Sequence, residues 1–426
     1  MPLALSQLAQ HLMGLVDTAM LGHYDRVALA GAGIGNSLIF TITVLGLGAV
    51  MGLDTLVPQA IGAGEEARAR RLLWQGLRLA VLTGVPLTLI TAAMPLLLGP
   101  AGVDAAVAHQ SSIYVLWRLP AVIPFLVFAA LRSYLQAIGI TRPIVLAMIF
   151  GNLINVAADA VLIFGWGPIP ALGVTGAAIA TSAVSIAITV VLALAVRAAP
   201  TPGAGVPERD PAMMRAIFRL GLPVGLQLMA EVGVFGLASV LAGRLGQVPA
   251  SAHQVALTCV SFTFAAVIGI GAATSVRVGR AVGREDLPGT RRAGITGLVF
   301  GAGFMSFTAL LFLLLPAQVA RLFTDEQAVV TAAVPLMRIA ALFQLSDGAQ
   351  AIAAGALRGA GDTRSPLWGN LAGHYALGFP VMLALAFAAG MGAPGLWWGL
   401  SAGLTATALV LIARFLWVSA RPIARA

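Results

Sequence analysis

The chain has 426 residues, of which 59% are hydrophobic and 10% are charged, and its mean hydropathy is +0.95. Soluble domains carry about 25% charged residues, so this composition excludes a soluble globular fold and indicates that a lipid bilayer is the solvent. The net charge of +9 does not indicate a nucleic-acid partner, because the arginines lie in short loops between apolar runs. The single cysteine, Cys259, excludes an internal disulfide framework and a cysteine metal cluster.

Apolar stretches of about 20 residues, the length that crosses a bilayer, follow one another along the whole chain. The sequence therefore predicts an all-α integral membrane protein with twelve transmembrane helices. Their expected bounds are 2–22, 32–54, 76–98, 111–131, 143–165, 173–196, 220–242, 254–276, 294–315, 335–357, 366–389 and 394–417. The first stretch has no basic segment before it and continues past any cleavage site, so we interpret it as a span rather than a signal peptide.

The arginines predict how these spans are oriented. One set of alternate loops holds most of them, whereas the opposite set holds only Arg26, Arg244 and Arg321. Cytoplasmic loops carry the excess of basic residues, so we expect a multi-pass protein of a bacterial inner membrane with both termini in the cytoplasm.

The longest polar connection, 197–219, divides six spans from six. It contains Pro200, Thr201, Pro202, Gly203, Gly205 and Pro207. This composition predicts a cytoplasmic linker between an N-terminal six-helix bundle, 1–196, and a C-terminal six-helix bundle, 220–426.

The two halves resemble each other at a constant offset near 221 residues. Gly22 matches Gly243, Gly48 matches Gly269, Gly62 matches Gly283, and the Gly139 turn matches the Gly361 turn at offset 222. Each half has six spans, so a pseudo-twofold axis along the membrane normal is expected to relate the two bundles, as in transporters. The second half has a basic amphipathic lead-in, 213–222, without a counterpart before Pro2, so we expect the natural chain to begin upstream of Met1.

Five carboxylates lie inside the predicted spans: Asp17, Asp54, Asp159, Glu231 and Asp347. A charge near the bilayer centre costs at least ~2.5–3.5 kcal/mol, so chains usually keep such groups to move ions or solutes. Asn155 and Asp159 lie one turn apart on one helix face, which indicates either a polar wall of a cavity or an interhelical hydrogen-bond ladder. Asp17 is either a cation-binding group or a helix-end acid, and Asp54 is equally well explained as a solvated acid at a helix end.

The two acids of the second half, Glu231 and Asp347, lie in the middle of their spans and each follows a glutamine by about one turn. Neither span supplies an obvious permanent counter-ion, so these acids are suited to binding and releasing a proton or another cation. Arg118 and Arg338, near outer span ends, are explained by snorkelling to the interface or, alternatively, by a gate between the halves. The sequence has no lysine and no Gly-x4-Gly-Lys-Ser/Thr loop, which argues against transport driven by ATP in this chain alone.

Four motifs resemble those of the multidrug and toxic compound extrusion (MATE) family. They are Val16-Asp-Thr-Ala-Met-Leu-Gly22, Gln59-Ala-Ile-Gly-Ala-Gly-Glu65, Arg277-Val-Gly-Arg-Ala-Val-Gly283 and Ala356-Leu-Arg-Gly-Ala-Gly-Asp-Thr-Arg364. The resemblance covers essentially the whole chain. It implies twelve helices in two lobes that form a V, and cation-coupled export of amphipathic, often cationic, compounds.

The bacterial NorM-type branch is the closer match, and it implies coupling roles for Asp17, Glu231 and Asp347. Phe343 stands where that branch is expected to have a tyrosine, so a hydroxyl is lost but a ring face remains for a cation. Asn155 and Asp159 resemble the polar pair of the DinF-type branch, in which an N-lobe carboxylate is linked to proton coupling. The resemblance leaves both H⁺ and Na⁺ open as the coupling ion, and the last two features favour H⁺.

The sequence thus predicts a secondary active antiporter, not an enzyme, that exports amphipathic organic cations in exchange for H⁺ or Na⁺ and needs no cofactor. Its cavity is expected to be lined by Asp17, Asn155, Asp159, Glu231, Phe343 and Asp347, with Na⁺ able to bind at Glu231 and Asp347. Expected partners are small organic cations or amphipathic drugs and the lipid bilayer, with no nucleic acid, and the chain is expected to be a monomer. The alternative is a flippase for a lipid-linked precursor of the same wider superfamily, which is expected to have a basic cavity.

Overall fold

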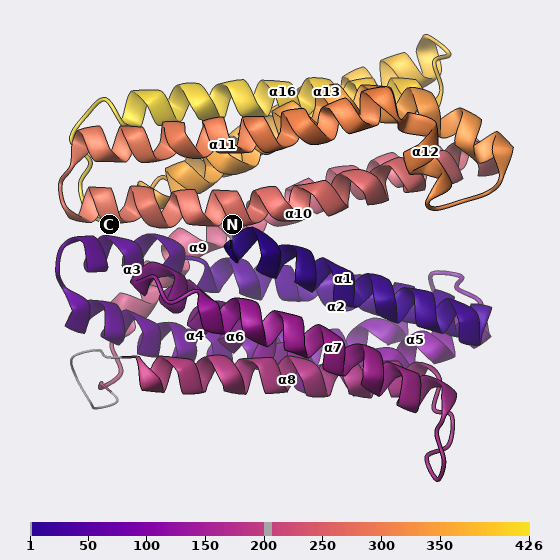
Figure 1. Ribbon diagram of the computed structural model, residues 1–426, viewed down its shortest axis with the longest axis horizontal. Helices are drawn as coiled ribbons and strands as arrows, with labels where there is room; N and C mark the ends of the chain where they lie inside the picture. Colours follow the sequence, from indigo (N-terminus) through magenta and orange to yellow (C-terminus); the bar gives the residue numbers. More distant parts are fainter. Residues whose placement is uncertain (1, 200–206) are drawn as a thin grey trace.

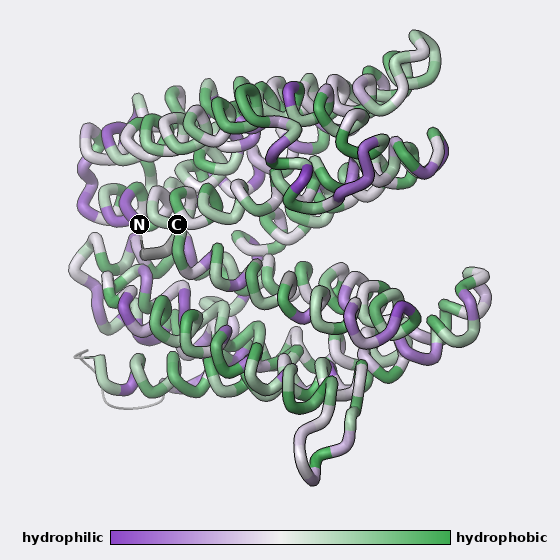
Figure 2. Tube along the Cα trace, turned by 45° about the vertical axis from the view of Figure 1, so that its right-hand side comes forward, coloured by the Kyte–Doolittle hydropathy of each residue, from purple (hydrophilic) through white to green (hydrophobic). Residues whose placement is uncertain are grey.

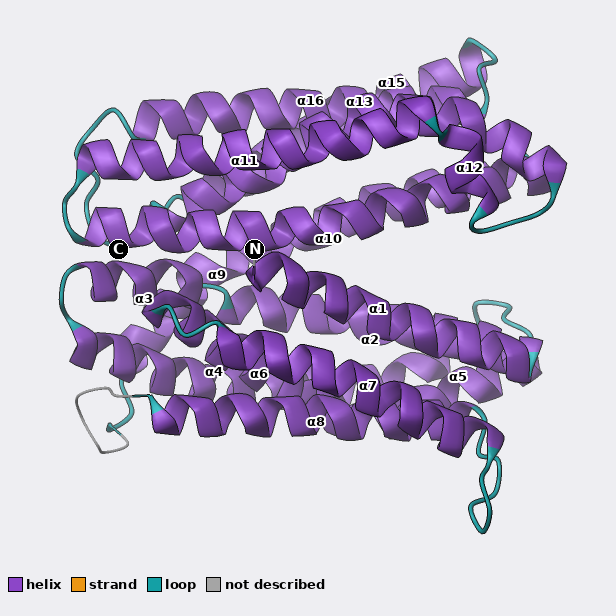
Figure 3. Ribbon diagram, in the orientation of Figure 1, coloured by secondary structure: helices purple, strands orange, loops and turns teal. Residues whose placement is uncertain are grey.

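The computed structural model describes residues 2–199 and 207–426, and these residues form helices joined by short connections (Figure 3). Within the described ranges, eleven helical segments are long and apolar enough to cross a membrane. The 23-residue helix α1 (Pro2–Tyr24) packs against α2, α7 and α10 and is the twelfth. The predicted all-α membrane architecture is therefore confirmed.

Two bundles follow the two halves of the chain (Figure 1). The first, called here the N-lobe, continues with α2 (Arg26–Val50), α3 (Leu53–Gly62), α4 (Glu66–Ala93), η1 (Met94–Leu97), α5 (Ala105–Arg118), η2 (Leu119–Ala121), α6 (Val122–Ile138), α7 (Arg142–Phe164) and α8 (Val174–Ala198). The second, the C-lobe, contains α9 (Pro211–Arg244), α10 (Gln247–Gly283), α11 (Leu287–Leu314), α12 (Pro316–Arg321), α13 (Gln327–Gly359), α14 (Arg364–Asn370), η3 (Leu371–Gly378), α15 (Phe379–Leu383), η4 (Ala384–Ala388) and α16 (Ala393–Val418).

Aspartates begin several of these helices. The carboxylates of Asp25, Asp210 and Asp286 accept hydrogen bonds from the backbone N–H groups of Ala28, Met213 and Gly289 at 2.8, 3.0 and 2.8 Å. Each bond satisfies a donor that the first helical turn leaves without a partner. The acids outside the spans therefore set the places where helices start.

The outer surface of the molecule is apolar, as a bilayer requires. Large side chains such as Leu89, Val240 and Phe307 are 67%, 64% and 69% exposed. Figure 2 shows hydrophobic residues along the length of the bundles. Because lipid replaces water around these helices, their exposed apolar side chains need no protein cover.

The two lobes lie close together at the end that holds both termini and diverge toward the other end (Figure 1). We call these the closed end and the open end. At the closed end the lobes meet backbone to backbone, since a Cβ atom on Gly48 of α2 would overlap the Cα atom of Gly225 in α9. Likewise, a Cβ atom on Gly221 would overlap the carbonyl oxygen of Ala49.

Contacts across the closed end occur in symmetric pairs. A Cβ on Gly62 would meet the Arg280 carbonyl, and a Cβ on Gly283 would meet the Gln59 carbonyl; both pairs of positions are related by an offset of 221. Two interlobe hydrogen bonds are also related by the repeat. Gln59 Nε2 donates to the Gly359 carbonyl at 3.0 Å, and Arg280 Nε donates to the Ala137 carbonyl at 2.9 Å. The predicted pseudo-twofold axis thus passes through the closed end.

The connection between the lobes differs in one respect from the predicted linker 197–219. Helix α8 extends to Ala198 and α9 already begins at Pro211, so the basic lead-in 213–222 is the first part of a membrane helix. Pro200, Thr201, Pro202, Gly203 and Gly205 lie outside the described residues. After them, the chain is held against α4, because Arg78 donates to the Pro207 carbonyl at 2.5 Å and Gln75 donates to the Glu208 carbonyl at 2.8 Å.

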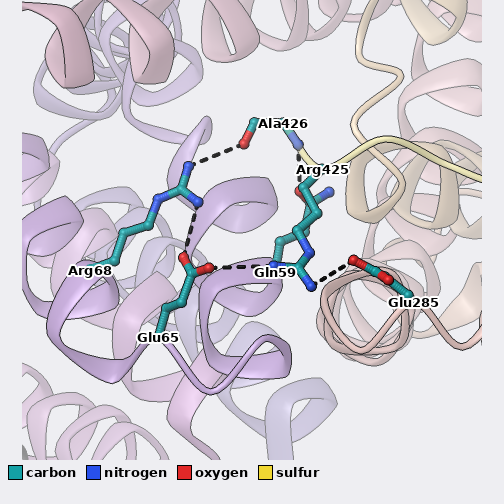
Figure 4. Close-up of polar contacts among 6 residues, drawn as sticks. All are labelled: Gln59, Glu65, Arg68, Glu285, Arg425 and Ala426. Carbon is teal, nitrogen blue, oxygen red and sulfur yellow. Dashed lines mark hydrogen bonds and ion pairs between the residues drawn. The ribbon is translucent and has the colours of Figure 1, made fainter.

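The C-terminal tail adds a polar link across the closed end (Figure 4). The Arg425 guanidinium contacts Glu65 of the N-lobe at 3.3 Å and Glu285 of the C-lobe at 2.8 Å. Next to it, the Ala426 backbone N–H donates to Gln59 Oε1 at 2.8 Å, and Arg68 contacts Glu65 at 3.0 Å. One tail side chain therefore connects the α3–α4 turn with the α10–α11 turn.

Replacing Arg425 with glutamine is expected to loosen the closed end modestly. The ion pairs are exposed, and such pairs contribute up to about 1 kcal/mol, so the population with a separated closed end should rise roughly two- to fivefold. Spin labels at Glu66→Cys and Arg284→Cys, in a Cys259→Ser background, would report this as a longer distance component. Arg421→Gln is the matched control, because Arg421 lies over the Trp417 ring at 4.1 Å; an equal shift in both variants would contradict the role of Arg425.

Candidate functional site

The polar residues predicted for the first half come together inside the N-lobe. Asp17 of α1 is 7% exposed, and its Oδ2 accepts a hydrogen bond from Thr181 Oγ1 of α8 at 2.8 Å. Asp159 of α7 is fully buried and lies next to Asp17, close enough for the two carboxyl groups to share a hydrogen bond. Because α7 starts at the closed end and Asp159 is near its other terminus, this pair lies toward the open end.

Asn155 extends this pair by one helical turn along α7. Its side chain is fully buried, and neither its Oδ1 nor its Nδ2 has a hydrogen-bond partner in the described part of the chain. The only side-chain partner of Asp159 in the described residues is the neighbouring carboxyl group of Asp17. Buried polar atoms are normally hydrogen-bonded, so this group of atoms is poised to take a proton, an ion or water. The interhelical ladder that was the alternative for Asn155 is not formed.

Two residues of α5 complete the N-lobe group; the sequence analysis explained Arg118 by snorkelling or an interlobe gate and did not single out Tyr114. Arg118 interacts electrostatically with Asp17, and Tyr114, one turn earlier and 4% exposed, contacts Arg118. Arg118 therefore lies inside the N-lobe beside an acid and is not a contact between the two lobes. The sequence signal that could have placed Arg118 inside the lobe is its i, i+4 spacing from Tyr114.

The C-lobe acids form a second group. Gln350 of α13 lies next to Glu231 of α9, with Nε2 3.5 Å from Glu231 Oε2. Asp347, one turn before Gln350 and 3% exposed, interacts electrostatically with Glu231. Gln350 Oε1 is buried and has no hydrogen-bond partner among the described residues. Two carboxylates and a free amide oxygen are the donor set that a hard monovalent cation prefers, so the residues present fit Na⁺ as well as H⁺.

Phe343 lies one turn from Asp347 but in a different environment from the one expected. Its ring is fully buried, at 6.0 Å from the Phe235 ring and 5.4 Å from the Trp397 ring, measured between centroids. Trp397 in turn contacts His253 at 5.8 Å. In this conformation the Phe343 ring is fully buried among aromatic neighbours, so the side chain does not line an open wall.

A third acid, Asp54, connects the two lobes, a role that the sequence analysis did not predict. Its Oδ2 is 3.8 Å from Arg358 of the C-lobe, and its Oδ1 accepts a short hydrogen bond from Ser133. The side chains of Asp54 and Arg358 are only 15% and 14% exposed. Arg358 also interacts electrostatically with Glu231. Asp54 therefore forms an interlobe ion pair with Arg358, next to the C-lobe group, and is not a solvated acid at a helix end.

The structure thus divides the six predicted residues among three places. Asp17, Asn155 and Asp159 form the N-lobe group, Glu231 and Asp347 form the C-lobe group, and Phe343 belongs to the aromatic cluster. Both acid groups are buried in helices that cross the membrane. Asp159 and Asp347 interact with a neighbouring carboxyl group and with no basic side chain in the described residues, and a membrane-embedded acid of this kind is suited to binding a cation reversibly. A membrane fold of two six-helix bundles related by an axis along the membrane normal defines the class of membrane transporters.

Comparison with known proteins agrees with this class. The MatE family model matches residues 2–161 and 223–383, one segment in each half. The chain is 36% identical to a probable multidrug resistance protein NorM from Pseudomonas putida, covering 100% of this chain and 94% of that protein. It is 37% identical to a probable NorM from Deinococcus radiodurans, with coverage of 98% and 93%, and 32% identical to the multidrug resistance protein NorM of Aliivibrio fischeri, with coverage of 99% and 94%.

Solved structures share the fold. The eukaryotic MATE transporter AtDTX14 superposes with a TM-score of 0.88 at 24% identity, covering 97% of this chain and 93% of that one. An outward-facing multidrug resistance MATE family transporter superposes with a TM-score of 0.90 at 20% identity, covering 99% and 94%. This chain belongs to the MATE family, and its bacterial relatives place it in the NorM-type branch. It is accordingly a multi-pass membrane transporter and not an enzyme.

Proposed function

We propose that the protein is a secondary active antiporter that exports amphipathic, often cationic, organic compounds in exchange for H⁺ or Na⁺. The observation that carries this proposal is the pair of buried acid groups, one in each lobe, in a chain of the MATE family. Acidic groups attract cationic substrates and can hold a coupling cation. A flippase for a lipid-linked pyrophosphate is not favoured, because the embedded groups are acidic.

The N-lobe group supports H⁺ as the coupling ion. Two neighbouring carboxyl groups in an apolar environment repel each other when both are ionised, so they favour holding one proton between them. Asp17 and Asp159 have this arrangement, and Thr181 donates to Asp17 and orients it. In the C-lobe, Glu231 and Asp347 would take the second cation, which can be H⁺ or Na⁺. The mechanism needs no cofactor.

Transport follows from a difference in ion affinity between two conformations. A ligand shifts a conformational equilibrium only by its differential affinity for the two states. Ion loading and substrate loading would therefore favour opposite transitions through the same acids, and this reciprocal effect is antiport. The C-lobe group lies beside Arg358, whose ion pair with Asp54 joins the lobes, so a change of charge at Glu231 acts directly on an interlobe contact.

The orientation proposed for this cycle places the closed end in the cytoplasm. The turns at this end carry Arg68, Arg142, Arg284 and Arg364, which fits the positive-inside rule. Both termini would then be cytoplasmic, in the inner membrane of a bacterium, and the conformation described would open outward. The N-terminal bundle, 1–196, and the C-terminal bundle, 220–426, would be the two moving bodies of a monomer.

Proteoliposomes test this function directly. A fluorescent organic cation is loaded, and either a proton gradient or a sodium gradient is imposed alone. Release driven by one gradient identifies the coupling ion and supports antiport. Release driven by neither gradient, in intact vesicles with verified orientation, would contradict the proposal and favour a lipid flippase.

Asp159→Asn is expected to reduce proton-driven release strongly while sparing the fold. The substitution keeps the shape of the side chain but removes one of the two carboxyl groups that hold the proton. A coupling free energy of 1–3 kcal/mol corresponds to a loss of roughly 5- to 150-fold. Asp104→Asn is the matched control, because Asp104 caps α5 from outside the spans, and asparagine caps equally well. Proton-driven release at the normal rate in Asp159→Asn would remove the N-lobe group from the mechanism.

A further inference from the structure

A groove at the closed end of the C-lobe is not part of either acid group. It has a volume of about 540 Å³ and lies between the first turns of α9 and the start of α14, which pack side by side. Its charged side chains are those of Arg215, Arg219, Arg364 and Asp362, and Ala426 of the C-terminal tail also lines it. The lobes' acidic interior thus contrasts with a basic recess at the closed end of one lobe, beside the C-terminal tail.

The three arginines of this groove are available for a ligand. Arg215 and Arg219 lie one turn apart on α9, so their side chains share a face. Arg364 adds a third guanidinium from α14, and all three residues are exposed. Within the described residues, none of the three has a hydrogen-bond or ion-pair partner. Three unpaired guanidinium groups lining one recess attract an anion with several oxygen acceptors.

The one acid in the groove does not neutralise these arginines. Asp362 Oδ2 accepts from Arg414 Nε at 2.8 Å and from Ser365 Oγ at 2.7 Å, and its Oδ1 accepts from the Ser365 backbone N–H at 3.1 Å. Its oxygens are thus turned toward α16 and the α14 turn. The groove therefore keeps a positive net charge.

Apolar side chains extend from the arginines along the same two helices. On α9, Phe218 and Leu222 are 38% and 36% exposed, and on α14, Trp368 is 66% exposed one turn after Arg364. These residues lie on membrane helices, and their exposed apolar surface is accessible from outside the lobe. A basic recess at a helix end, continued by an apolar surface, matches a molecule with an anionic head and apolar tails.

We propose that this groove binds the phosphate headgroup of an anionic membrane phospholipid, with its acyl chains along Phe218, Leu222 and Trp368. Guanidinium groups bind phosphate oxygens in a bidentate manner. Basic pockets at the ends of transmembrane helices select anionic over zwitterionic headgroups for this reason. The site belongs to the lead-in of α9, which follows the connection between the lobes, so the bound lipid would hold that segment against α14.

Trp368 provides the test, because its exposed ring lies where the acyl chains would lie. The full-length protein is placed in phosphatidylcholine nanodiscs with rising fractions of brominated phosphatidylglycerol, and the Trp368 fluorescence is taken as the difference between the protein and Trp368→Phe. The reciprocal titration uses brominated phosphatidylcholine in a phosphatidylglycerol background. We expect half-quenching by the anionic lipid at a mole fraction at least roughly fivefold lower than by the zwitterionic lipid.

The variant Arg215→Gln/Arg219→Gln/Arg364→Gln should lose this preference. The matched control, Arg71→Gln/Arg291→Gln/Arg292→Gln, removes equal charge from exposed arginines at the same end but outside the groove. Retained preference in the first variant, or an equal loss in the control, would overturn the proposal. A preference that excess inorganic phosphate abolishes would also overturn it, since the ligand would then be a soluble phosphate; a preference that resists phosphate supports a lipid. No transport measurement is involved, so the outcome is independent of the antiport mechanism.

Discussion

Asp347→Asn should strongly reduce ion-driven export and leave the protein as stable as before, or more stable. Asp347 is buried next to a second acid, Glu231, and contacts no fixed counter-ion in the described residues. A charge in the membrane interior costs at least ~2.5–3.5 kcal/mol on insertion scales, so an amide of the same shape relieves a cost. The same change removes the cation site, and transport should fall by roughly 5- to 150-fold, the range of typical coupling energies.

Measuring both stability and ion-driven export distinguishes a functional acid from a structural one. A structural acid would lose stability on substitution, whereas a functional one gains stability and loses activity. Thermal unfolding in detergent and gradient-driven efflux from proteoliposomes measure the two effects on the same preparation. Glu231→Gln should behave in the same way, and Asp325→Asn, an exposed acid outside the spans, should change neither. Normal export by both Asp347→Asn and Glu231→Gln would show that the C-lobe assignment is wrong.

Gly48→Val should force the closed end apart and stop transport. Any side chain at Gly48 overlaps the Gly225 backbone, and neither α2 nor α9 can yield without separating the lobes. Overpacking of this kind costs typically about 1–3 kcal/mol, which is enough to reverse an equilibrium between two conformations of similar energy. The spin-label pair at Glu66→Cys and Arg284→Cys should then show predominantly the longer distance.

Gly33→Val is the matched control for this result. Gly33 lies on the same helix α2, is exposed, and has no atom within 4 Å of an added Cβ. The two variants share the same change in helix propensity, so any difference between them comes from the interlobe contact. If Gly48→Val keeps the short label distance and normal export, the backbone contact is not what closes this end.

The number and order of the membrane helices could be predicted because hydrophobic length is a local property of the sequence. The interruptions of the α-helix within these spans could not be predicted. The span predicted at 366–389 is α14, η3, α15 and η4, with π-helical turns in which His374 and Tyr375 lie. Tyr375 donates from this segment to the Ala230 carbonyl at 2.7 Å, a tertiary contact next to Glu231 that no local pattern encodes.

The individual residues of the candidate site could be predicted from the sequence, but their grouping in space could not. Helical spacing placed Asn155 with Asp159, since both lie on one helix. The distribution of acids between two separate groups depends on how helices pack, which sequence periodicity does not report. The position of Phe343 shows the limit: its relation to Asp347 along α13 was correct, yet its ring direction is determined by Phe235 and Trp397 on other helices.

The mirrored joints at the closed end have a consequence for how the molecule switches. Gly62 with Arg280 and Gly283 with Gln59 are two copies of one joint, placed on either side of the pseudo-twofold axis. Opening of the closed end has to separate both joints, because each of them joins the same two lobes. The duplication of the chain thus gives this end two equivalent contacts, and a substitution that weakens one of them leaves the other in place.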